Sequence, residues 1–289
     1  MKTTYNFILA LFFLGIASFA NAKNEGQDFY KEVRKSFAVN ANVILDMDIN
    51  FGNVTATSWD QNFMEILVKM NVNVKSEKRA EDIFRGVDIT ESATTPRVRV
   101  NPGNSNGKNE SYDIYVEIKM PKSTSFTGSI EFGNCAINSV TGSVRLKVQY
   151  GNISITEALS NDNDIDVAFG NMIVDVCNGG HLTEQYGNVR VGKAKGNIKI
   201  HTDFGNVEVR GFTKECKKLE IECDYGNIEV DTNGLGIRVD AEVSYGDIDV
   251  DAGKVNINKE DFSQNAEGSI GDGNTELELE CNFGNIEVN

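Results

Sequence analysis

Along most of the chain apolar residues alternate with polar ones, and the alternation changes phase at a recurring motif of aromatic, glycine, asparagine and aliphatic residues. In the copy at 225–228, apolar positions lie five, three and one residues before the glycine, and two and four residues after it. Side chains of a strand point alternately to opposite faces, so both arms can face one core only if the chain turns a corner at the Gly-Asn pair. Glycine accepts a positive φ without cost and asparagine nearly so. The pattern therefore predicts a strand on each side of the corner, with the aromatic ring and the aliphatic side chain both pointing inward.

The motif recurs at a nearly constant spacing. After a first copy at 51–54, the glycines from Gly133 onward follow one another by 18, 19, 17, 18, 21 and 20 residues and then by 38, close to two steps. A fixed period in this range is typical of a solenoid, in which each repeat contacts only its neighbours. The predicted corner residues are Gly133, Asn134, Gly151, Asn152, Gly170, Asn171, Gly187, Asn188, Gly205, Asn206, Gly226, Asn227, Gly246, Asp247, Gly284 and Asn285.

Stacked repeats of this kind predict an all-β fold, a single-stranded parallel β-helix (a β-solenoid), right-handed as parallel crossovers usually are. Stacking would bury columns of apolar side chains and align the asparagine amides in a ladder along the axis. Gly142, Gly196 and Gly211 lie about half a repeat away and fit a second corner. The alternative is an antiparallel meander with a hairpin at each Gly-Asn pair. Hairpins would place turns every ~8–12 residues, which is about half the observed spacing.

Three segments follow from these patterns. Residues 1–22 combine Lys2, a short apolar run and an A-x-A site, which is typical of a cleavable signal peptide. The run is too short to span a membrane, so we expect an exported protein without a transmembrane anchor after cleavage, located in the periplasm, on the outer cell surface or in the medium. Residues 23–122 predict a β-rich start of or cap to the solenoid, with one short helix at 77–86. Residues 123–289 predict the regular β-helix.

Charge and cysteine content exclude several classes of protein. After signal cleavage 27 basic residues face 43 acidic ones, a formal charge of −16. Nucleic-acid affinity depends on Lys and Arg neutralising phosphates, so a nucleic-acid partner is excluded. Five cysteines cannot all pair within one exported molecule, and no C-x-x-C or Cys/His cluster indicates zinc. Cys135, Cys223 and Cys281 occupy inward positions, whereas the sequence leaves open whether Cys177 and Cys216 pair.

At this point the chain resembles a known family. A strand ending near Trp59-Asp60, a strand ending in Met120-Pro121 and the repeats that follow an export signal are similar to the exported "putative adhesin" family of bacterial envelope proteins. The related auto-transporter adhesin head, or GIN, domain family is similar as well. The resemblance covers nearly the whole chain after the signal. It implies a β-helical fold and an envelope location, and it transfers no catalytic residues.

Chemistry-bearing motifs are few. His181 and His201 are expected at the surface, and the sequence contains no nucleophile elbow, phosphate loop, dinucleotide fingerprint or zinc-protease motif. We therefore expect no catalytic residues and no cofactor. The one pattern on outward positions is an acidic column three residues after the corner glycines, in which rungs ~4.8 Å apart would repel one another. Either solvent and basic neighbours make this tolerable, or calcium, which prefers oxygen ligands, bridges the column. The residues are Glu208, Glu229, Asp249 and Glu287.

The expected function is that of a non-catalytic, exported, adhesin-like scaffold of the cell envelope that binds a cell-surface protein or glycan along its faces. One alternative is a polysaccharide-processing lyase or hydrolase, because β-helices also host such enzymes. A second is an accessory protein in envelope stress or signalling. The chain ends at Asn289 inside a repeat strand, so we also expect an open C-terminal end of the solenoid that could associate with another copy.

Overall fold

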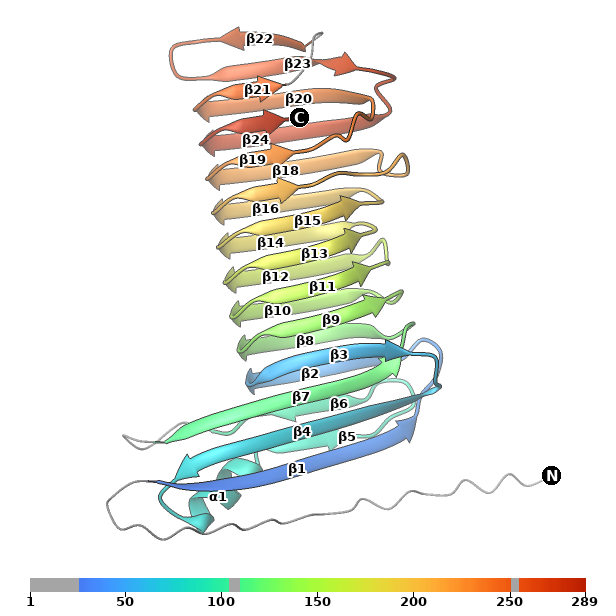
Figure 1. Cartoon of the computed structure of the whole chain (residues 1–289), viewed down its shortest axis with the longest axis vertical. Coiled ribbons are helices and arrows are strands. Elements are labelled where there is room, and N and C mark those ends of the chain that lie inside the picture. The colour runs from blue at the N-terminus through green and yellow to red at the C-terminus, as the bar shows by residue number, and fades with distance from the viewer. Residues whose placement is uncertain (1–25, 104–109, 251–254) are drawn as a thin grey trace, which may run out of the picture.

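The computed structural model describes residues 26–103, 110–250 and 255–289. In this part of the chain the strands form two long sheets that face each other, with one short helix at the N-terminal end (Figure 1). The predicted signal peptide lies outside the described residues. No helix of the described part is long and apolar enough to cross a membrane.

Sheet A contains 12 strands among the described residues and sheet B contains 13. In spatial order sheet A consists of β1 (Gln27–Ala38), β4 (Phe63–Val74), β7 (Ser111–Pro121), β3 (Asn53–Trp59), β9 (Cys135–Val140), β11 (Ile153–Ala158), β13 (Met172–Cys177), β15 (Val189–Ala194), β17 (Val207–Val209), β19 (Ile228–Val230), β25 (Ile286–Val288) and β21 (Ile248–Val250). Sheet B consists of β22 (Val255–Lys259), β23 (Gln264–Ile270), β20 (Ile237–Tyr245), β24 (Thr275–Phe283), β18 (Lys218–Tyr225), β16 (Ile198–Phe204), β14 (Gly180–Tyr186), β12 (Asn163–Phe169), β10 (Val144–Tyr150), β8 (Ser125–Phe132), β2 (Ile44–Phe51), β6 (Arg97–Val100) and β5 (Val87–Thr90).

Each copy of the motif joins a strand of sheet B to the next strand of sheet A, and such a pair is called a rung here. Successive rungs pair in parallel with the motifs in register, as where Tyr150 of β10 lies beside Phe169 of β12. The parallel β-solenoid is therefore confirmed, and the antiparallel meander is excluded because each corner connects two sheets rather than two neighbours in one. The solenoid has two flat faces, which the sequence did not indicate. Its right-handedness remains a prediction.

The C-terminal rung lies inside the stack rather than at its end. β24 pairs with β18 on one side and with β20 on the other, and β25 lies between β19 and β21 (Figure 1). The rung that contains Gly284 thus separates the rungs of Gly226 and Gly246, although it follows both in sequence. The expected open C-terminal end is therefore wrong, because both edges of the last strand are paired. The end of the stack is instead formed by β20 and β21, with β23 added antiparallel to β20 and β22 antiparallel to β23.

The aromatic rings of the motif point outward, which corrects the prediction that they face the core. From β8 to β24 and β20 these rings are 43–52 % exposed, whereas the residue two positions before each ring is buried. The alternation therefore breaks one residue before the glycine. Facing sheets lie only ~10 Å apart, and the side chains three before and two after the glycine, such as Cys223 and Ile228, already fill the space inside the corner.

Glycine is required at the corner because neighbouring rungs approach each other closely there. A Cβ on any of the corner glycines from Gly133 on would lie 1.5–2.0 Å from the carbonyl oxygen of the preceding glycine in the stack. Several of them, such as Gly205 with a φ of 151°, also adopt backbone conformations unfavourable for other residues. Gly187 has no left-handed φ, yet its Cβ would lie 1.6 Å from the oxygen of Gly170. Close packing of backbone against backbone is thus the reason why every one of these corners needs glycine.

The N-terminal part closes the other end of the solenoid. The rung of Gly52 already belongs to the stack, since β2 pairs with β8 and β3 with β9. Beyond it, β4 pairs antiparallel with β1 and β7. The helix α1 (Glu77–Phe84) begins at Ser76, whose hydroxyl accepts the backbone N–H of Arg79, and it buries Ala80, Ile83 and Phe84. The helix predicted at 77–86 is present, and the charged residues of β1 mark a protected edge strand.

Substituting Gly187 by alanine tests the close approach at the corner. The new methyl group would meet the oxygen of Gly170 and force two rungs apart, so we expect the free energy of unfolding in a denaturant titration to fall by roughly 3 kcal/mol or more. Gly103→Ala is the control, because Gly103 has a φ of 74° but nothing within 4 Å of its Cβ position. It should lose only about 1–2 kcal/mol. Equal losses in the two variants would contradict the steric explanation.

Candidate functional site

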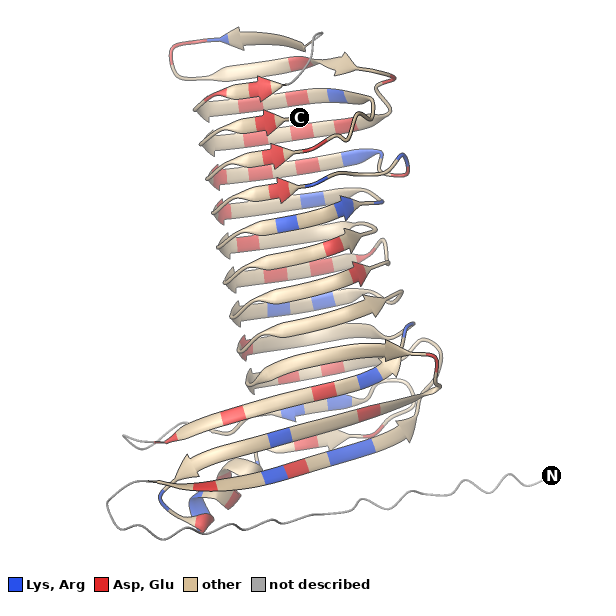
Figure 2. Cartoon of the chain, viewed as in Figure 1, with Lys and Arg blue, Asp and Glu red and all other residues tan. Residues whose placement is uncertain are grey.

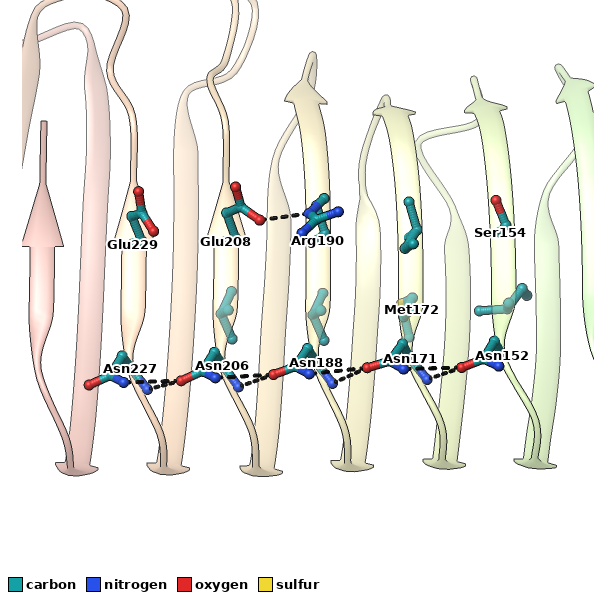
Figure 3. Close-up of a pocket in the computed structure, with 14 residues that line it drawn as sticks. Asn152, Ser154, Asn171, Met172, Asn188, Arg190, Asn206, Glu208, Asn227 and Glu229 are labelled. Carbon is teal, nitrogen blue, oxygen red and sulfur yellow. Dashed lines mark hydrogen bonds and ion pairs between the residues drawn. The ribbon is translucent and has the colours of Figure 1, made fainter.

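A shallow groove of about 650 Å³ runs along the outer surface of sheet A, parallel to the stack. It crosses the first residues of five consecutive strands, from β11 to β19, so equivalent positions of five rungs line it (Figure 3). One wall is the row of corner asparagines. The other is the row of outward residues two positions later, which includes Ser154, Arg190 and Glu208, and buried side chains such as Val189 form the floor.

The asparagine wall is a continuous hydrogen-bonded ladder. At each step from Asn53 to Asn227, the side-chain oxygen accepts both the backbone N–H and the side-chain N–H of the next asparagine, at 2.9–3.1 Å and 2.9–3.2 Å. A primary amide carries two N–H groups, and one of them is used within the ladder. Among the described residues nothing accepts the second, so the groove has a row of amide donors spaced by one strand separation, ~4.8 Å.

The ladder ends on an aspartate rather than an asparagine. The backbone N–H of Asp247 donates to the side-chain oxygen of Asn285 at 2.9 Å. The carboxylate of Asp247 has no N–H group to donate in turn, but it accepts a hydrogen bond from Gln264 at 2.7 Å and lies 3.6 Å from the ammonium of Lys259. The step from Asn285 to Asp247 thus has the backbone hydrogen bond of the ladder but lacks the side-chain one.

The opposite wall of the groove carries one charge network. The Glu208 carboxylate pairs with Arg190 and Arg210, each at 2.6 Å. Hydrogen bonds from Arg210 and then Arg190 lower the pKa of Glu208, so this carboxylate stays ionised. Figure 3 shows the pair formed by Arg190 and Glu208 on the side of the groove that faces the asparagines.

The predicted acidic column exists, in an order that the sequence did not reveal. Because the C-terminal rung is inserted, Glu208 lies beside Glu229, Glu229 beside Glu287, and Glu287 beside Asp249. Glu208 has basic partners, whereas the other three carboxylates form no ion pair with the described residues. No three acidic, histidine or cysteine side chains of the described part converge tightly enough to hold a metal ion. Calcium would therefore have to bridge neighbouring carboxylates, and its binding remains a prediction.

The negative charge is concentrated at one end of the rod. Residues 219–289 contain 18 of the 43 acidic residues but only 3 of the 28 basic ones, so they carry the whole formal charge of −15, and the rest of the chain is neutral. Figure 2 shows acidic residues on both sheets at the C-terminal end and mixed charges elsewhere. On sheet B, Lys199 bridges Glu220 and Glu222 at 2.6 and 2.7 Å, and hydrogen bonds to both raise the pKa of Lys199.

The outward rings form a second continuous feature, along the edge where the two sheets meet. Neighbouring rings are stacked with centroids 4.8–5.0 Å apart and planes within 5° of parallel. We call this row the aromatic edge. In stacking order it consists of Phe132, Tyr150, Phe169, Tyr186, Phe204, Tyr225, Phe283 and Tyr245.

The cysteines are buried and His201 is paired, whereas His181 is exposed on β14, as expected. All five cysteines are free and buried, which answers the open question about Cys177 and Cys216. Burial raises the pKa of the Cys135 thiol to about 12 and of the Cys177 and Cys216 thiols to about 11, so they are poor nucleophiles. His201 lies between Asp203 and Glu222 on the outer face of sheet B, at 3.0 and 3.4 Å.

Glu184 is a buried carboxyl group that we did not predict. It occupies the inward position three residues before Gly187, where other rungs have residues such as Cys223, and it is fully buried. Its side chain accepts the backbone N–H of Tyr186 at 3.0 Å and lies 3.5 Å from the hydroxyl of Thr202. Desolvation raises the pKa of Glu184 to about 7. A charged residue on an inward position was the sequence signal that could have revealed it.

Sequence reasoning found some elements of this surface and missed others. The amide ladder and the acidic column follow from the period of the motif. The groove was missed, although a comparison of outward residues across all rungs would have shown Ser154 and Arg190 in the row that later becomes acidic. The aromatic edge was missed because the rings were assigned to the core.

The model of the family described as Toastrack DUF4097 matches residues 44–289. Among curated proteins none matches the sequence. The link to the GIN domain family remains a prediction.

Several solved structures are similar at low sequence identity. A protein from Bacteroides fragilis described as a putative adhesin has a TM-score of 0.48 and 11 % identity, covering 90 % of this chain and 97 % of its own. Another from Parabacteroides distasonis, also described as a putative adhesin, has a TM-score of 0.44 and 10 % identity over 90 % and 97 % of the two chains. A third, from the same species and described as a putative lipid binding protein, has a TM-score of 0.36 and 12 % identity over 89 % and 96 %.

Glu184→Gln tests the buried carboxyl group through the pH dependence of stability. The folded state holds the Glu184 proton more tightly than the unfolded state, so its stabilising effect is full below the unfolded pKa and disappears as the pH rises through about 7. Glutamine keeps the shape and one acceptor without the charge. Between pH 4.5 and pH 8.5 we expect the free energy of unfolding of the variant to rise by roughly 1–3 kcal/mol relative to that of the native chain. A difference between the two proteins that does not change with pH would contradict the assignment.

Calcium binding to the acidic column is tested by thermal melting. If calcium bridges Glu229, Glu287 and Asp249, millimolar calcium should raise the melting temperature by relieving their repulsion. The double variant Glu229→Gln/Glu287→Gln should melt higher than the native chain without calcium and should not respond to it. Magnesium at the same concentration controls for ionic strength. No shift of the native chain at millimolar calcium would overturn the hypothesis.

Proposed function

The chain belongs to the Toastrack DUF4097 family, and from that premise we propose that it is a non-catalytic, adhesin-like protein of the cell envelope that binds a linear surface polysaccharide along the groove of sheet A. The model of this family matches residues 44–289. Export rests on the predicted signal peptide at 1–22. The observation that carries the proposal is the groove itself, in which five rungs present the same amide group at equal spacing.

A repeating row of donors suits a repeating ligand. A linear polysaccharide offers hydroxyl and ring oxygens at regular intervals, and each can accept a hydrogen bond from an amide N–H of the ladder. Single hydrogen bonds of this type contribute only about 0.5–1.5 kcal/mol each, so affinity would come from several rungs engaged at once. A rigid ladder has already lost its side-chain freedom, which lowers the entropic cost of binding.

The electrostatics of the rod favour a neutral polymer. The C-terminal end, where the groove reaches Glu229, carries the formal charge of −15. An acidic polysaccharide would be repelled over distances of about one Debye length, ~8–10 Å at physiological salt. Arg190, the cationic residue in the groove, is already paired with Glu208.

The groove does not have the arrangement of a polysaccharide-cleaving site. Glycosidases place two carboxyl groups on either side of the bond, and one of them must carry a proton. Here Glu208 and Glu229 lie on the same wall, in neighbouring strands, and the opposite wall consists of amides. Glu208 is held ionised by two arginines. This geometry supports binding rather than hydrolysis.

Ser154→Trp tests the groove, because Ser154 is exposed in one wall and a large ring there would block it without altering the ladder. On an array of neutral and acidic polysaccharides we expect the native chain to bind neutral linear polymers. The variant should lose affinity by roughly tenfold or more. Ser129→Trp, at a half-buried serine on the outer face of sheet B, is the control and should bind normally. Absence of binding to any polysaccharide, or equal binding by both variants, would contradict the proposal.

A further inference from the structure

The aromatic edge is a larger exposed apolar surface than a monomer normally carries. Its eight rings are each 43–52 % exposed. With about 150–250 Å² per aromatic side chain, they expose roughly 600–900 Å² in one unbroken stripe. The largest patch of a typical monomer is about 300–600 Å². We propose that this edge is the interface of an antiparallel, two-fold symmetric dimer of the chain.

The area of the stripe is that of a stable dimer. If two copies bury their stripes against each other, roughly 1,200–1,800 Å² disappear from solvent, which falls within the range of ~1,200–2,000 Å² for stable interfaces. The stripe is about 34 Å long, which is seven strand spacings of ~4.8 Å. A two-fold interface brings the same patch of both copies together, so one stripe per chain is sufficient.

The rings present their edges outward, because their faces are covered by one another. Planes within 5° of parallel and centroids 4.8–5.0 Å apart leave no ring face free between the two ends of the row. A sugar ring stacks on an aromatic face, so the edge is not a sugar platform. Ring edges pack well against other aromatic side chains, and such pairs contribute about 0.5–1.5 kcal/mol beyond their buried area.

The order of the rings fits an antiparallel arrangement. Phenylalanine and tyrosine alternate along the whole row, but only in stacking order, where Phe283 separates Tyr225 from Tyr245. When a row of eight alternating residues is reversed, each phenylalanine takes the place of a tyrosine and each tyrosine takes the place of a phenylalanine. Two antiparallel rows in full register therefore place a phenylalanine opposite every tyrosine, with Tyr186 opposite Phe204 of the partner subunit beside the two-fold axis. In a parallel pair tyrosine hydroxyls would meet each other.

The charged residues that flank the edge also favour this orientation. An antiparallel two-fold axis brings sheet A beside sheet A, whereas a parallel one brings sheet A beside sheet B. On the sheet A side the corner asparagines lie next to the rings, and the outward row beyond them is Ala136, Ser154, Ile173, Arg190, Glu208, Glu229, Glu287 and Asp249. On the sheet B side the flanking row is Glu131, Gln149, Ala168, Gln185, Asp203, Asp224, Asn282 and Ser244.

Reversal of these rows separates the carboxylates. In the antiparallel pair Glu208 lies level with Arg190 of the partner subunit, Asp249 lies level with an alanine, and no acidic residue of either row is level with another. In the parallel pair Glu208 would lie level with one aspartate and Glu229 with another, at two adjacent rungs. Like charges opposite each other in an interface are costly, and the antiparallel form also keeps the two acidic ends of the rods apart.

The dimer would have a consequence for binding. With sheet A beside sheet A, the two grooves lie on one face of the dimer and run in opposite directions. Two sites on one face can engage a long polymer at once, which raises the effective affinity. The dimer itself does not depend on what the grooves bind.

Sedimentation velocity of the chain across a concentration series tests the proposal. We expect a monomer–dimer equilibrium, and Tyr186→Lys at the centre of the edge should raise its dissociation constant roughly tenfold or more. Tyr115→Lys is the matched control, since Tyr115 is exposed to the same 49 % but lies outside the edge, on β7. A monomer at every concentration, or equal effects of the two variants, would overturn the proposal. So would a monomer that floats with phosphatidylcholine vesicles through the same rings.

The orientation is tested by a spin label at Glu131→Cys, since the five native cysteines are buried and remain unlabelled. Glu131 lies at one end of the edge. In the antiparallel dimer the two labels should be separated by about 34 Å or more, seven strand spacings. A separation well below seven strand spacings would show a parallel dimer and overturn the antiparallel assignment.

Discussion

The contact between successive corner glycines sets the geometry on which the rest of the structure depends. Each glycine brings its backbone so close to the next that even a methyl group would overlap a carbonyl oxygen. This contact keeps the rungs in register, so equivalent residues of different repeats form straight rows. The amide ladder, the aromatic edge, the groove and the acidic column are all such rows. Their spacing is that of hydrogen-bonded strands, ~4.8 Å, and none of them would be continuous if a rung shifted by one residue.

The period and phase of the motif were sufficient to predict the parallel solenoid and the amide ladder, because both depend on local alternation and on identical repeats. The direction of the rings could not be read in this way. The alternation breaks at Tyr225 and its equivalents, where the thickness of the core rather than strand geometry decides which side chain fits. The insertion of the rung of Gly284 between those of Gly226 and Gly246 was also invisible, since a repeat carries no mark of which neighbour it will contact.

The candidate site was likewise predictable from the sequence only in part. The acidic column followed from the spacing of Glu208, Glu229 and Asp249, but its order needed the inserted rung. The groove depends on the depth between two rows, which a sequence pattern does not contain. The rod thus has distinct surfaces, with hydrogen-bond donors on the groove of sheet A, apolar rings on one edge and carboxylates at the C-terminal end. For these three surfaces in turn we propose a repeating polymer and a second copy of the chain as partners, and we predict cations.

Residue-resolved amide hydrogen exchange of the native chain measures the central claim most directly. The backbone N–H groups of Asn152, Asn171 and Asn188 lie in exposed corners, yet each donates to the side-chain oxygen of the preceding rung. If the corner stack holds the rungs together, these groups should exchange as slowly as the buried strands on either side, because they open only when the rungs separate. Exchange at the rate of an ordinary exposed turn, with the flanking strands still protected, would contradict the account.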